Sequence, residues 1–295
     1  MNNVLERSTN WVKERGAKAL FRYQGGKQRL CRFLVGLYPE GINRYFEPFI
    51  GAGSMFFELR NKGFRGPAFL GDWNPAIVNV HQVVATDPDG FEAAYRIHVE
   101  QHCRDYFYLL RDQDISGWTP LERAARTVYL SKTAFHGLLR VDRQGRIVST
   151  YGTGELSRAV LDGERIRKAS EAFRGADIRQ GDFGWVEPMA ESGDFVFLDP
   201  PYVGGNVAYS AEGFGEKDQQ RLLQMCRNLT AKGVRFMQTN SDRPVVRELY
   251  RDFHIRAVSP APAIGRGGVG RQPVGEVVIN NYESEWAVGE IGVAA

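Results

Sequence analysis

The 295-residue sequence predicts an α/β fold with a parallel, doubly wound sheet and an inserted helical module. Apolar runs rich in strand-forming residues recur along the chain and end in turn residues, and helical patterns lie between most of them. Strands that alternate with helices favour a parallel sheet covered on both faces. The composition, 43% hydrophobic and 25% charged, is typical of a soluble globular protein.

Each run expected to form a parallel strand ends in residues that favour turns. These runs are RYFEPFIGAG (44–53), PAFLGDWN (67–74), ADIRQGDFG (176–184), DFVFLDPPY (194–202) and GVRFMQTNS (233–241). Helical patterns follow the first run (54–63) and precede the last (218–233), where Gly233 is a typical helix-ending residue. Two closing runs, 252–259 and 275–282, flank a glycine-rich loop into which no helix fits, so we expect them to pair antiparallel at the sheet edge.

Residues 83–165 interrupt this alternation and predict an inserted module. Helical patterns cover 106–114, 120–135 and 155–173, and residues 136–154 predict a β-hairpin with Gly145 in its turn. We therefore expect a main α/β domain formed by residues 17–82 and 166–295, an insertion at 83–165, and an N-terminal extension over residues 1–16.

Several classes of protein are excluded by what the sequence lacks. No stretch approaches the roughly 20 apolar residues of a membrane span, and the first residues lack the apolar segment of a secretory signal. Cys31, Cys103 and Cys226 are isolated, which favours a reducing compartment without disulfides or a zinc site. His98 and His102 lie one helical turn apart but lack the glutamate of a zinc-protease motif. We expect a cytoplasmic protein with no metal and no membrane partner.

The net charge of +3 is unevenly distributed. Residues 1–30 carry seven Lys or Arg against two Glu, and residues 132–146 carry four basic side chains against one Asp. Local basic patches on a nearly neutral protein suit a polyanion that touches selected faces. Solvated surface charge remains the alternative interpretation.

The segment Phe49-Ile50-Gly51-Ala52-Gly53 lies where a strand should turn into a helix. Glycines there allow a tight turn and the close approach of a ligand to the backbone. Phe56 replaces the third glycine of a dinucleotide motif, so the pattern favours a nucleoside without a pyrophosphate. Asp72 ends the next strand 19 residues after Gly53, at the offset where an acid bonds ribose hydroxyls.

A third feature, Asp199-Pro200-Pro201-Tyr202, ends the buried run at 195–202. Prolines cannot extend a strand ladder, so nearby carbonyls become available to a ligand. An acceptor-rich corner with an aromatic ring suits a planar ligand that carries an NH2 group. An ordinary proline turn is the alternative. All three features fall at carboxyl ends of strands, where open α/β sheets bind ligands.

Two further polar residues are candidates for cofactor contacts. Asp182 ends another strand and could accept the exocyclic amine of a cofactor adenine, although a simple loop acid is an equal alternative. Lys27 could neutralise the carboxylate of an amino-acid cofactor.

The ordered set of motifs resembles the Dam-type (D12 class) N6-adenine DNA methyltransferases from Phe21 to Tyr282. The matching stretches are FRYQGGK, YFEPFIGAGSMFFEL, FLGDWNPAIVNVHQVV, YLSKTAFHGLLR, FLDPPY and VGEVVINNY. The resemblance implies a Rossmann-like catalytic domain, S-adenosylmethionine as cofactor, an inserted target-recognition domain, and methyl transfer to N6 of an adenine flipped out of double-stranded DNA. It also implies a restriction endonuclease as a candidate partner, and we expect a monomer or weak dimer.

The resemblance assigns roles to individual residues. The catalytic motif would be Asp199, Pro200, Pro201 and Tyr202. Cofactor contacts would be Tyr23, Lys27, Glu47, Phe49, Gly51, Gly53, Asp72, Asp182, Phe183 and Asp199. DNA would be read by Arg22, Phe135, His136, Leu138 and Arg140. This chain has Phe135-His136-Gly137 where Dam proteins usually have Tyr-Asn-Gly, and its loop at 265–270 lacks the usual Gly-Thr-Arg-Lys character, which leaves the common GATC target open.

Other activities remain alternatives at this stage. They are methylation of an RNA adenine, methylation of a protein amide, and nucleic-acid binding by a vestigial methyltransferase fold. Protein-glutamine methyltransferases characteristically carry Asn-Pro-Pro-Tyr, so Asp199 and the basic module favour the DNA enzyme.

Overall fold

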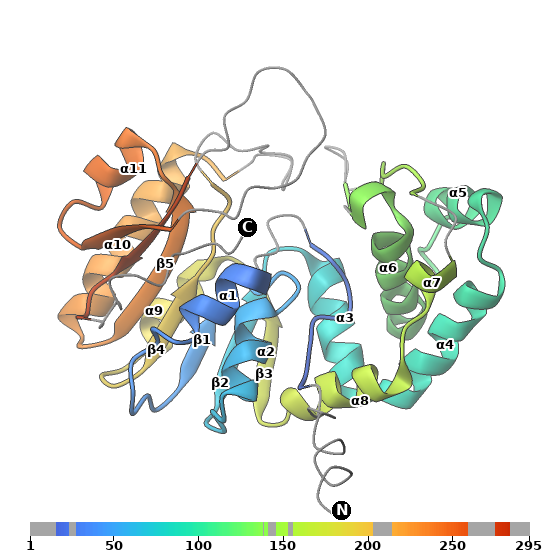
Figure 1. The fold of residues 1–295 in the computed structure, drawn as a ribbon, viewed down its shortest axis with the longest axis horizontal. Coiled ribbons are helices and arrows are strands. Elements are labelled where there is room, and N and C mark those ends of the chain that lie inside the picture. Colours follow the sequence, from blue (N-terminus) through green and yellow to red (C-terminus); the bar gives the residue numbers. More distant parts are fainter. Residues whose placement is uncertain are drawn as a thin grey trace, which may run out of the picture.

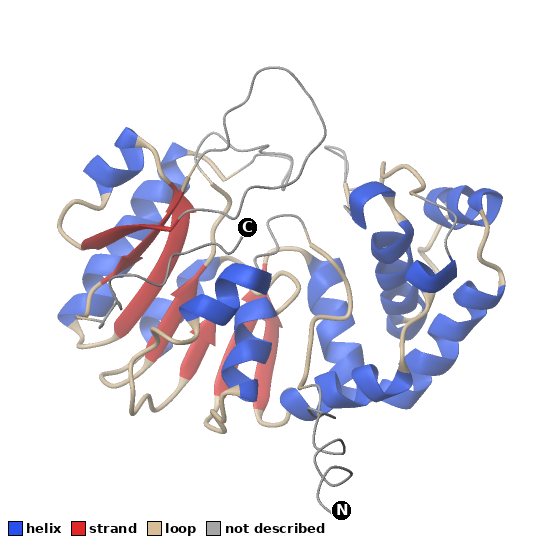
Figure 2. Ribbon diagram, viewed as in Figure 1, coloured by secondary structure: helices blue, strands red, loops and turns tan. Residues whose placement is uncertain are grey.

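The computed structural model describes residues 16–23, 28–137, 139–140, 146–152, 156–202, 214–258 and 275–283. Within them a seven-stranded sheet has the order β3-β2-β1-β4-β5-β7-β6 (Figures 1 and 2). Its strands are β1 (Tyr45–Glu47), β2 (Ala68–Asp72), β3 (Ala176–Gln180), β4 (Phe195–Leu198), β5 (Arg235–Ser241), β6 (His254–Val258) and β7 (Glu276–Asn280). The five strands β1 to β5 are parallel to one another, and β7 runs antiparallel to both β5 and β6. The predicted α/β fold and its antiparallel closing pair are confirmed.

Strand order reverses between β1 and β4, which lie side by side although β2 and β3 intervene in the sequence. Such a switch point brings the carboxyl ends of parallel strands and the loops after them to one ligand-binding edge. The features predicted to bind ligands follow β1, β2, β3 and β4 and therefore share this edge.

Helices cover both faces of the sheet because alternate residues of each strand point to opposite sides. Tyr45, Phe195 and Phe197 pack in one core, and Phe46 and Val196 pack in the other. The first core contains residues of α1 (Gln28–Leu34), α2 (Ser54–Asn61), α3 (Pro75–Thr86) and α8 (Gly163–Ala172). The second contains residues of α9 (Val186–Met189), α10 (Glu216–Ala231) and α11 (Pro244–Leu249).

The remaining helices lie within residues 83–165, where the sequence predicted an inserted module. They are α4 (Pro88–Glu100), α5 (Arg104–Asp112), α6 (Pro120–Thr133) and α7 (Leu156–Ala159), and they lie to one side of the sheet with α3 and α8 between (Figure 1). The expected limits, residues 83 and 165, fall inside α3 and α8, and the division into domains stays a prediction.

One helical expectation needs correction. Residues 155–173 read as one helical stretch, but α7 and α8 are separate helices with residues 160–162 between them. The cause is local, since the Asp162 side chain accepts a 3.0 Å hydrogen bond from the Glu164 backbone and caps a new helix. None of the helices in the described ranges is both long and apolar enough to cross a membrane.

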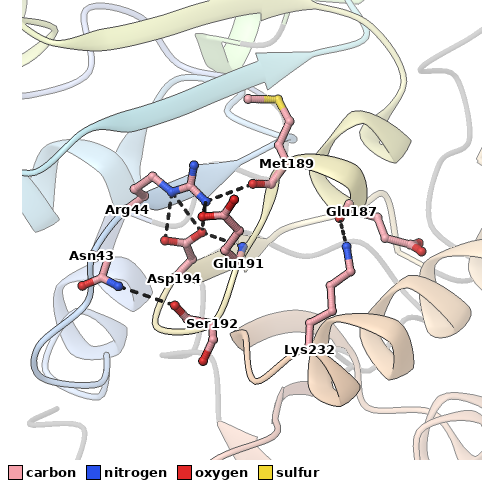
Figure 3. Close-up of polar contacts among 8 residues, drawn as sticks. All are labelled: Asn43, Arg44, Glu187, Met189, Glu191, Ser192, Asp194 and Lys232. Atoms are coloured by element: carbon pink, nitrogen blue, oxygen red, sulfur yellow. Dashed lines mark hydrogen bonds and ion pairs between the residues drawn. The ribbon is translucent and has the colours of Figure 1, made fainter.

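Arg44 and Asp194 form an ion pair at the amino-terminal ends of β1 and β4 (Figure 3). Arg44 precedes β1, and its Nη2 donates at 2.6 Å to Asp194, which precedes β4 and is 1% exposed. The same nitrogen donates to the Met189 carbonyl at 3.0 Å, and the Glu191 backbone donates to Asp194 at 2.8 Å. These contacts fix β1 against β4 and so fix the relative positions of the loops at their other ends.

Candidate active site and DNA-recognition segment

The loop after β1 depends on glycine for its conformation. Gly51 and Gly53 have φ angles of 48° and 79°, a left-handed region that strains other residues. A Cβ atom on Gly51 would lie 3.1 Å from the ring of Tyr23, so that ring lies directly on the loop. The structure therefore brings Tyr23, Gly51 and Gly53 together, as the sequence analysis expected.

Two side chains hold the backbone of Gly51. Its N–H donates to Asp72 Oδ2 at 3.0 Å, and its carbonyl lies 2.7 Å from Nε2 of His81 on α3. Because a carbonyl only accepts, Nε2 carries the proton, and burial lowers the pKa of His81 to about 4, which keeps the ring neutral. His81 was not predicted from the sequence. The one sequence feature that could have indicated it is a polar side chain within the mainly apolar run VNVHQVV.

Asp72 has both oxygens in use. Oδ1 accepts from the backbone of Asn74 at 2.9 Å, and the Asn74 side chain also donates to the Tyr23 hydroxyl at 3.4 Å. Burial raises the pKa of Asp72 to about 6, and the hydrogen bonds from Asn74 and Gly51 oppose that rise. The group is therefore mainly a carboxylate at neutral pH, with lone pairs left for further donors.

Glu47 at the end of β1 is 2% exposed and lies beneath this edge. Tyr45 donates its hydroxyl to Glu47 at 2.8 Å. Burial raises the pKa of Glu47 to about 8, opposed by the Tyr45 hydrogen bond and reinforced by the negative charges of Asp199 and Asp72. Glu47 is therefore mostly protonated at neutral pH, which limits the negative charge gathered at the site.

The Asp-Pro-Pro-Tyr corner follows β4 and is fixed by β5 and α10. Leu198 pairs with Gln238, so Asp199 lies beside Thr239, whose hydroxyl donates to Asp199 Oδ1 at 2.5 Å. The Pro201 carbonyl accepts from Gln219 Nε2 at 3.3 Å. Thr239 is fully buried and was missed by the sequence analysis, because only the register of β4 against β5 reveals its position.

Pro200 is buried and Tyr202 half-buried. Burial raises the pKa of the Tyr202 hydroxyl well above its ordinary value, and the nearby carboxyl groups of Asp199 and Glu276 act in the same direction. The charges of Asp199 and Asp72 both act on Glu47, which indicates that the carboxyl ends of β1, β2 and β4 lie near one another.

Aromatic rings gather where β1 and β3 end. Phe49 lies 5.5 Å from Phe183 and 5.9 Å from Phe214 between ring centroids. Arg221 of α10 lies 4.8 Å above the Phe183 ring and pairs with Asp182 through Nη2 and Oδ1 at 2.6 Å. Phe49, Asp182 and Phe183 thus meet as expected, while Phe214 and Arg221 add contacts that the sequence analysis missed. Trp73, 58% exposed beside Asp72, was also missed.

The residues expected to read DNA follow α6. Phe135–Gly137 form a short turn, labelled η1, in which His136 adopts a left-handed conformation with φ 59°. Phe135 is 52% exposed, and Arg140 is exposed. A Cβ on Gly137 would lie 2.8 Å from Arg22 Cδ, so Arg22 packs on this turn. Lys27, Leu138, Gly145 and the loop at 265–270 lie outside the described residues.

The histidines of the helical module have structural surroundings. His98 Nδ1 lies 2.6 Å from the Tyr106 hydroxyl, and His102 Nδ1 lies 2.8 Å from the Tyr129 hydroxyl. Over the described ranges, no group of three or more His, Cys, Asp or Glu side chains has the arrangement of a metal site.

Comparison with known proteins identifies the family. The model of the D12 class N6 adenine-specific DNA methyltransferases matches residues 23–261. The chain belongs to this family. The predicted enzyme, a site-specific adenine DNA methyltransferase, is thereby confirmed.

Individual relatives agree with this assignment along most of their length. The type II methyltransferase M1.LlaDCHI of Lactococcus lactis subsp. cremoris is 32% identical over 272 residues, which cover 88% of this chain and 94% of that protein. The type II methyltransferase M.MjaIII of Methanocaldococcus jannaschii is 26% identical, covering 90% and 99%. A DNA adenine methylase of Vibrio cholerae is also 26% identical, covering 88% and 95%.

Proposed function

We propose that this D12 enzyme takes its methyl group from S-adenosylmethionine and transfers it to a flipped-out adenine at the Asp-Pro-Pro-Tyr corner. The observation that carries the proposal is the meeting of three features at one sheet edge: the Gly51 loop, Asp72 and Asp199. Each follows a different parallel strand, and only the fold brings them together. The cofactor, when bound, supplies a methyl group on a positively charged sulfur.

The described residues fit such a cofactor. Gly51 and Gly53 give the loop its left-handed turns, and the rings of Tyr23 and Phe57 fill the space that a side chain on either glycine would need. Asp72 would accept hydrogen bonds from ribose hydroxyls with its remaining lone pairs, as strand-end acids do in related folds. The exposed ring of Trp73 and the half-buried ring of Phe49 offer flat apolar surface for an adenine ring.

Asp199 would activate the target amine. The lone pair of adenine N6 is delocalised into the ring, so this nitrogen is a poor nucleophile. Hydrogen bonds from its two N–H groups to Asp199 and to the Pro200 carbonyl would favour a pyramidal nitrogen and stabilise the positive charge that develops on it. Thr239, whose hydroxyl donates to Oδ1, would hold the Asp199 carboxylate in place for this role.

The target base must leave the duplex to reach this corner. Flipping costs on the order of a few kcal/mol, and stacking of the base on Tyr202 would offset part of that cost. Arg140 would bond a guanine in the major groove, since arginine can bond O6 and N7 together. His136, which replaces the usual asparagine, would present a different donor–acceptor pattern, so we propose a recognition site that differs from GATC.

A methyl-transfer assay and sequencing test the proposal together. Purified protein with radiolabelled S-adenosylmethionine should label duplex DNA, and modified-base sequencing of DNA from expressing cells should place N6-methyladenine in one defined motif. Labelling of RNA in preference to duplex DNA, or methylated adenines without a shared motif, would contradict it. Cleavage of unmethylated DNA by extracts of the native host would test for an accompanying restriction endonuclease, and gel filtration would test the expected monomer or weak dimer.

A further inference from the structure

The base-reading segment, residues 135–140, is paired with a return segment, residues 146–152. The Val148 backbone donates to the Arg140 carbonyl at 2.8 Å, and the Phe135 backbone donates to the Thr150 carbonyl at 2.8 Å. Antiparallel contacts of this kind are those of the expected hairpin. Any group that fixes the return segment therefore also fixes the base-reading segment.

Three side chains from α5 and the turn before it bond the return segment. Arg111 Nη1 donates to the Ser149 carbonyl at 3.0 Å, and the Tyr151 backbone donates to the Tyr108 hydroxyl at 3.3 Å. The Tyr151 hydroxyl lies 3.3 Å from His102 Nε2. We refer to His102, Tyr108 and Arg111 as the hairpin support.

The hairpin support is itself held in place. Arg111 bonds both oxygens of Asp112, at 2.7 and 2.9 Å, and its guanidinium lies 4.8 Å from the centre of the Tyr108 ring. His102 contacts the buried Tyr129 hydroxyl through its other nitrogen at 2.8 Å. A neutral imidazole has one donor and one acceptor, so one of the two tyrosine hydroxyls must donate and the other accept. This complementarity fixes the imidazole orientation and, through it, Tyr151.

The backbone conformation of the base-reading segment requires contacts from other parts of the molecule. Among the described residues, His136 is the one non-glycine side chain with a positive φ angle. Left-handed conformations cost energy and persist when surrounding contacts over-determine them. Phe135, His136 and Arg140 are exposed, whereas Gly137 and Leu139 are buried. Further contacts come from the return segment and from Arg22, which packs on Gly137.

We infer that His102, Tyr108 and Arg111 are positioning residues for sequence recognition. They set the geometry of the base-reading segment from behind and need not touch DNA. The inference rests on the proposed function, in which residues 135–140 read bases. A different role is available to Arg111, which is partly exposed and could contact a phosphate.

Two conservative substitutions separate a positioning role from a phosphate contact. One removes a hydroxyl group, and the other keeps the positive charge. Methylation of a randomised duplex library by the full-length protein would be compared for wild type, Tyr108→Phe and Arg111→Lys. Tyr106→Phe is the matched control for the first, because its hydroxyl bonds His98. Arg123→Lys is the control for the second, because its guanidinium donates to the Ser116 carbonyl in a loop outside the hairpin. Cofactor affinity and the thermal midpoint would be measured for each protein.

Both test variants should reduce the ratio of rates on preferred and next-best sites by about three- to tenfold, the factor expected for one ordinary hydrogen bond. Cofactor affinity should stay unchanged, and both controls should keep the wild-type preference. An unchanged preference in both test variants, or an equal change in the controls, would overturn the inference. If Arg111 only contacts a phosphate, the lysine of Arg111→Lys keeps that charge, so both test variants would keep the wild-type preference and the inference would be overturned. If wild type itself methylates DNA without preference, the proposed function fails and this inference falls with it.

Discussion

The loop after β1 and the turn after α6 are both short and left-handed, but the molecule holds them differently. In the first, Asp72 and buried His81 bond the two backbone groups of Gly51, and both come from elements of the sheet domain. In the second, exposed His136 takes the strained conformation and support comes from half-buried side chains behind the hairpin. The loop after β1 is thus held by groups of the sheet domain, whereas the base-reading segment is held by a few half-buried side chains of the helical module. Substitutions should change rate and cofactor binding at the first and target choice at the second.

The largest expected effect tests the sheet edge directly. Asp199→Ala removes the charged acceptor beside the target amine, and methyl transfer should fall by at least about 10²–10³. Single-turnover rates with preserved cofactor binding would confirm that the loss is chemical. A folded variant with near-normal turnover would refute the role of Asp199 as the amine acceptor.

A pH experiment tests the burial of the sheet edge. Glu47 has its pKa raised from 4.5 to about 8, so the folded protein keeps a proton that the unfolded chain releases between these values. The free energy of unfolding should therefore fall as pH rises through that window, by up to about 1.4 kcal/mol per pH unit. Glu47→Gln, which cannot ionise, should remove this fall.

The comparison with Glu47→Gln isolates Glu47 in that experiment, because every other shifted group is present in both proteins. Asp72, with a pKa of about 6, adds to the fall near pH 6.5. His81 and His98, whose pKa values burial lowers from 6.5 to about 4, and Lys132, whose pKa burial lowers to about 8, act in the opposite direction. Denaturant titrations of wild type and Glu47→Gln should diverge from pH 6.5 to 8, and parallel curves would show that Glu47 ionises normally.

Asp72→Ala should weaken the cofactor rather than the chemistry. It removes the acceptor proposed for ribose and releases the Gly51 N–H, so affinity should fall at least about tenfold, as for lost hydrogen bonds to a charged group. Calorimetry with S-adenosylmethionine measures this, and Asp89→Ala on the distant surface of α4 is a control. Unchanged binding would reject the assignment of Asp72.

Substitutions in the base-reading segment should change which DNA sequences are methylated rather than the rate of methyl transfer. Arg140→Ala should relax preference at one guanine by about 1–3 kcal/mol of discrimination, and His136→Asn should shift or broaden the site. Methylation of a randomised duplex library provides the measurement. If both variants slow equally on every sequence, these residues brace the hairpin and do not read bases.

The smallest expected effect concerns Arg221, which pairs with Asp182 at the surface. Exposed ion pairs contribute about 0–1 kcal/mol, so Arg221→Gln should reduce cofactor affinity by less than about fivefold. A larger loss in calorimetry would indicate that Arg221 holds Asp182 in the position needed to accept the adenine amine.

The fold class, the five parallel strands and the residues at their ends could be predicted from the amino-acid sequence alone. Strand periodicity, glycine turns and the Asp-Pro-Pro-Tyr stop are local signals, so no long-range information is needed to find Gly51, Asp72 or Asp199. The ordered motifs also determined the family, which the match over residues 23–261 confirms.

The distant side chains that support those residues can be identified from the tertiary structure but not from the sequence. Thr239 meets Asp199 through the register of two strands, His81 reaches Gly51 from α3, and Arg111 reaches Ser149 across the module. Each of these partners lies 30 or more residues away along the chain, and each is an ordinary polar residue in an ordinary element. A contact of that kind leaves no periodic or compositional trace, because it depends on packing that the whole chain creates.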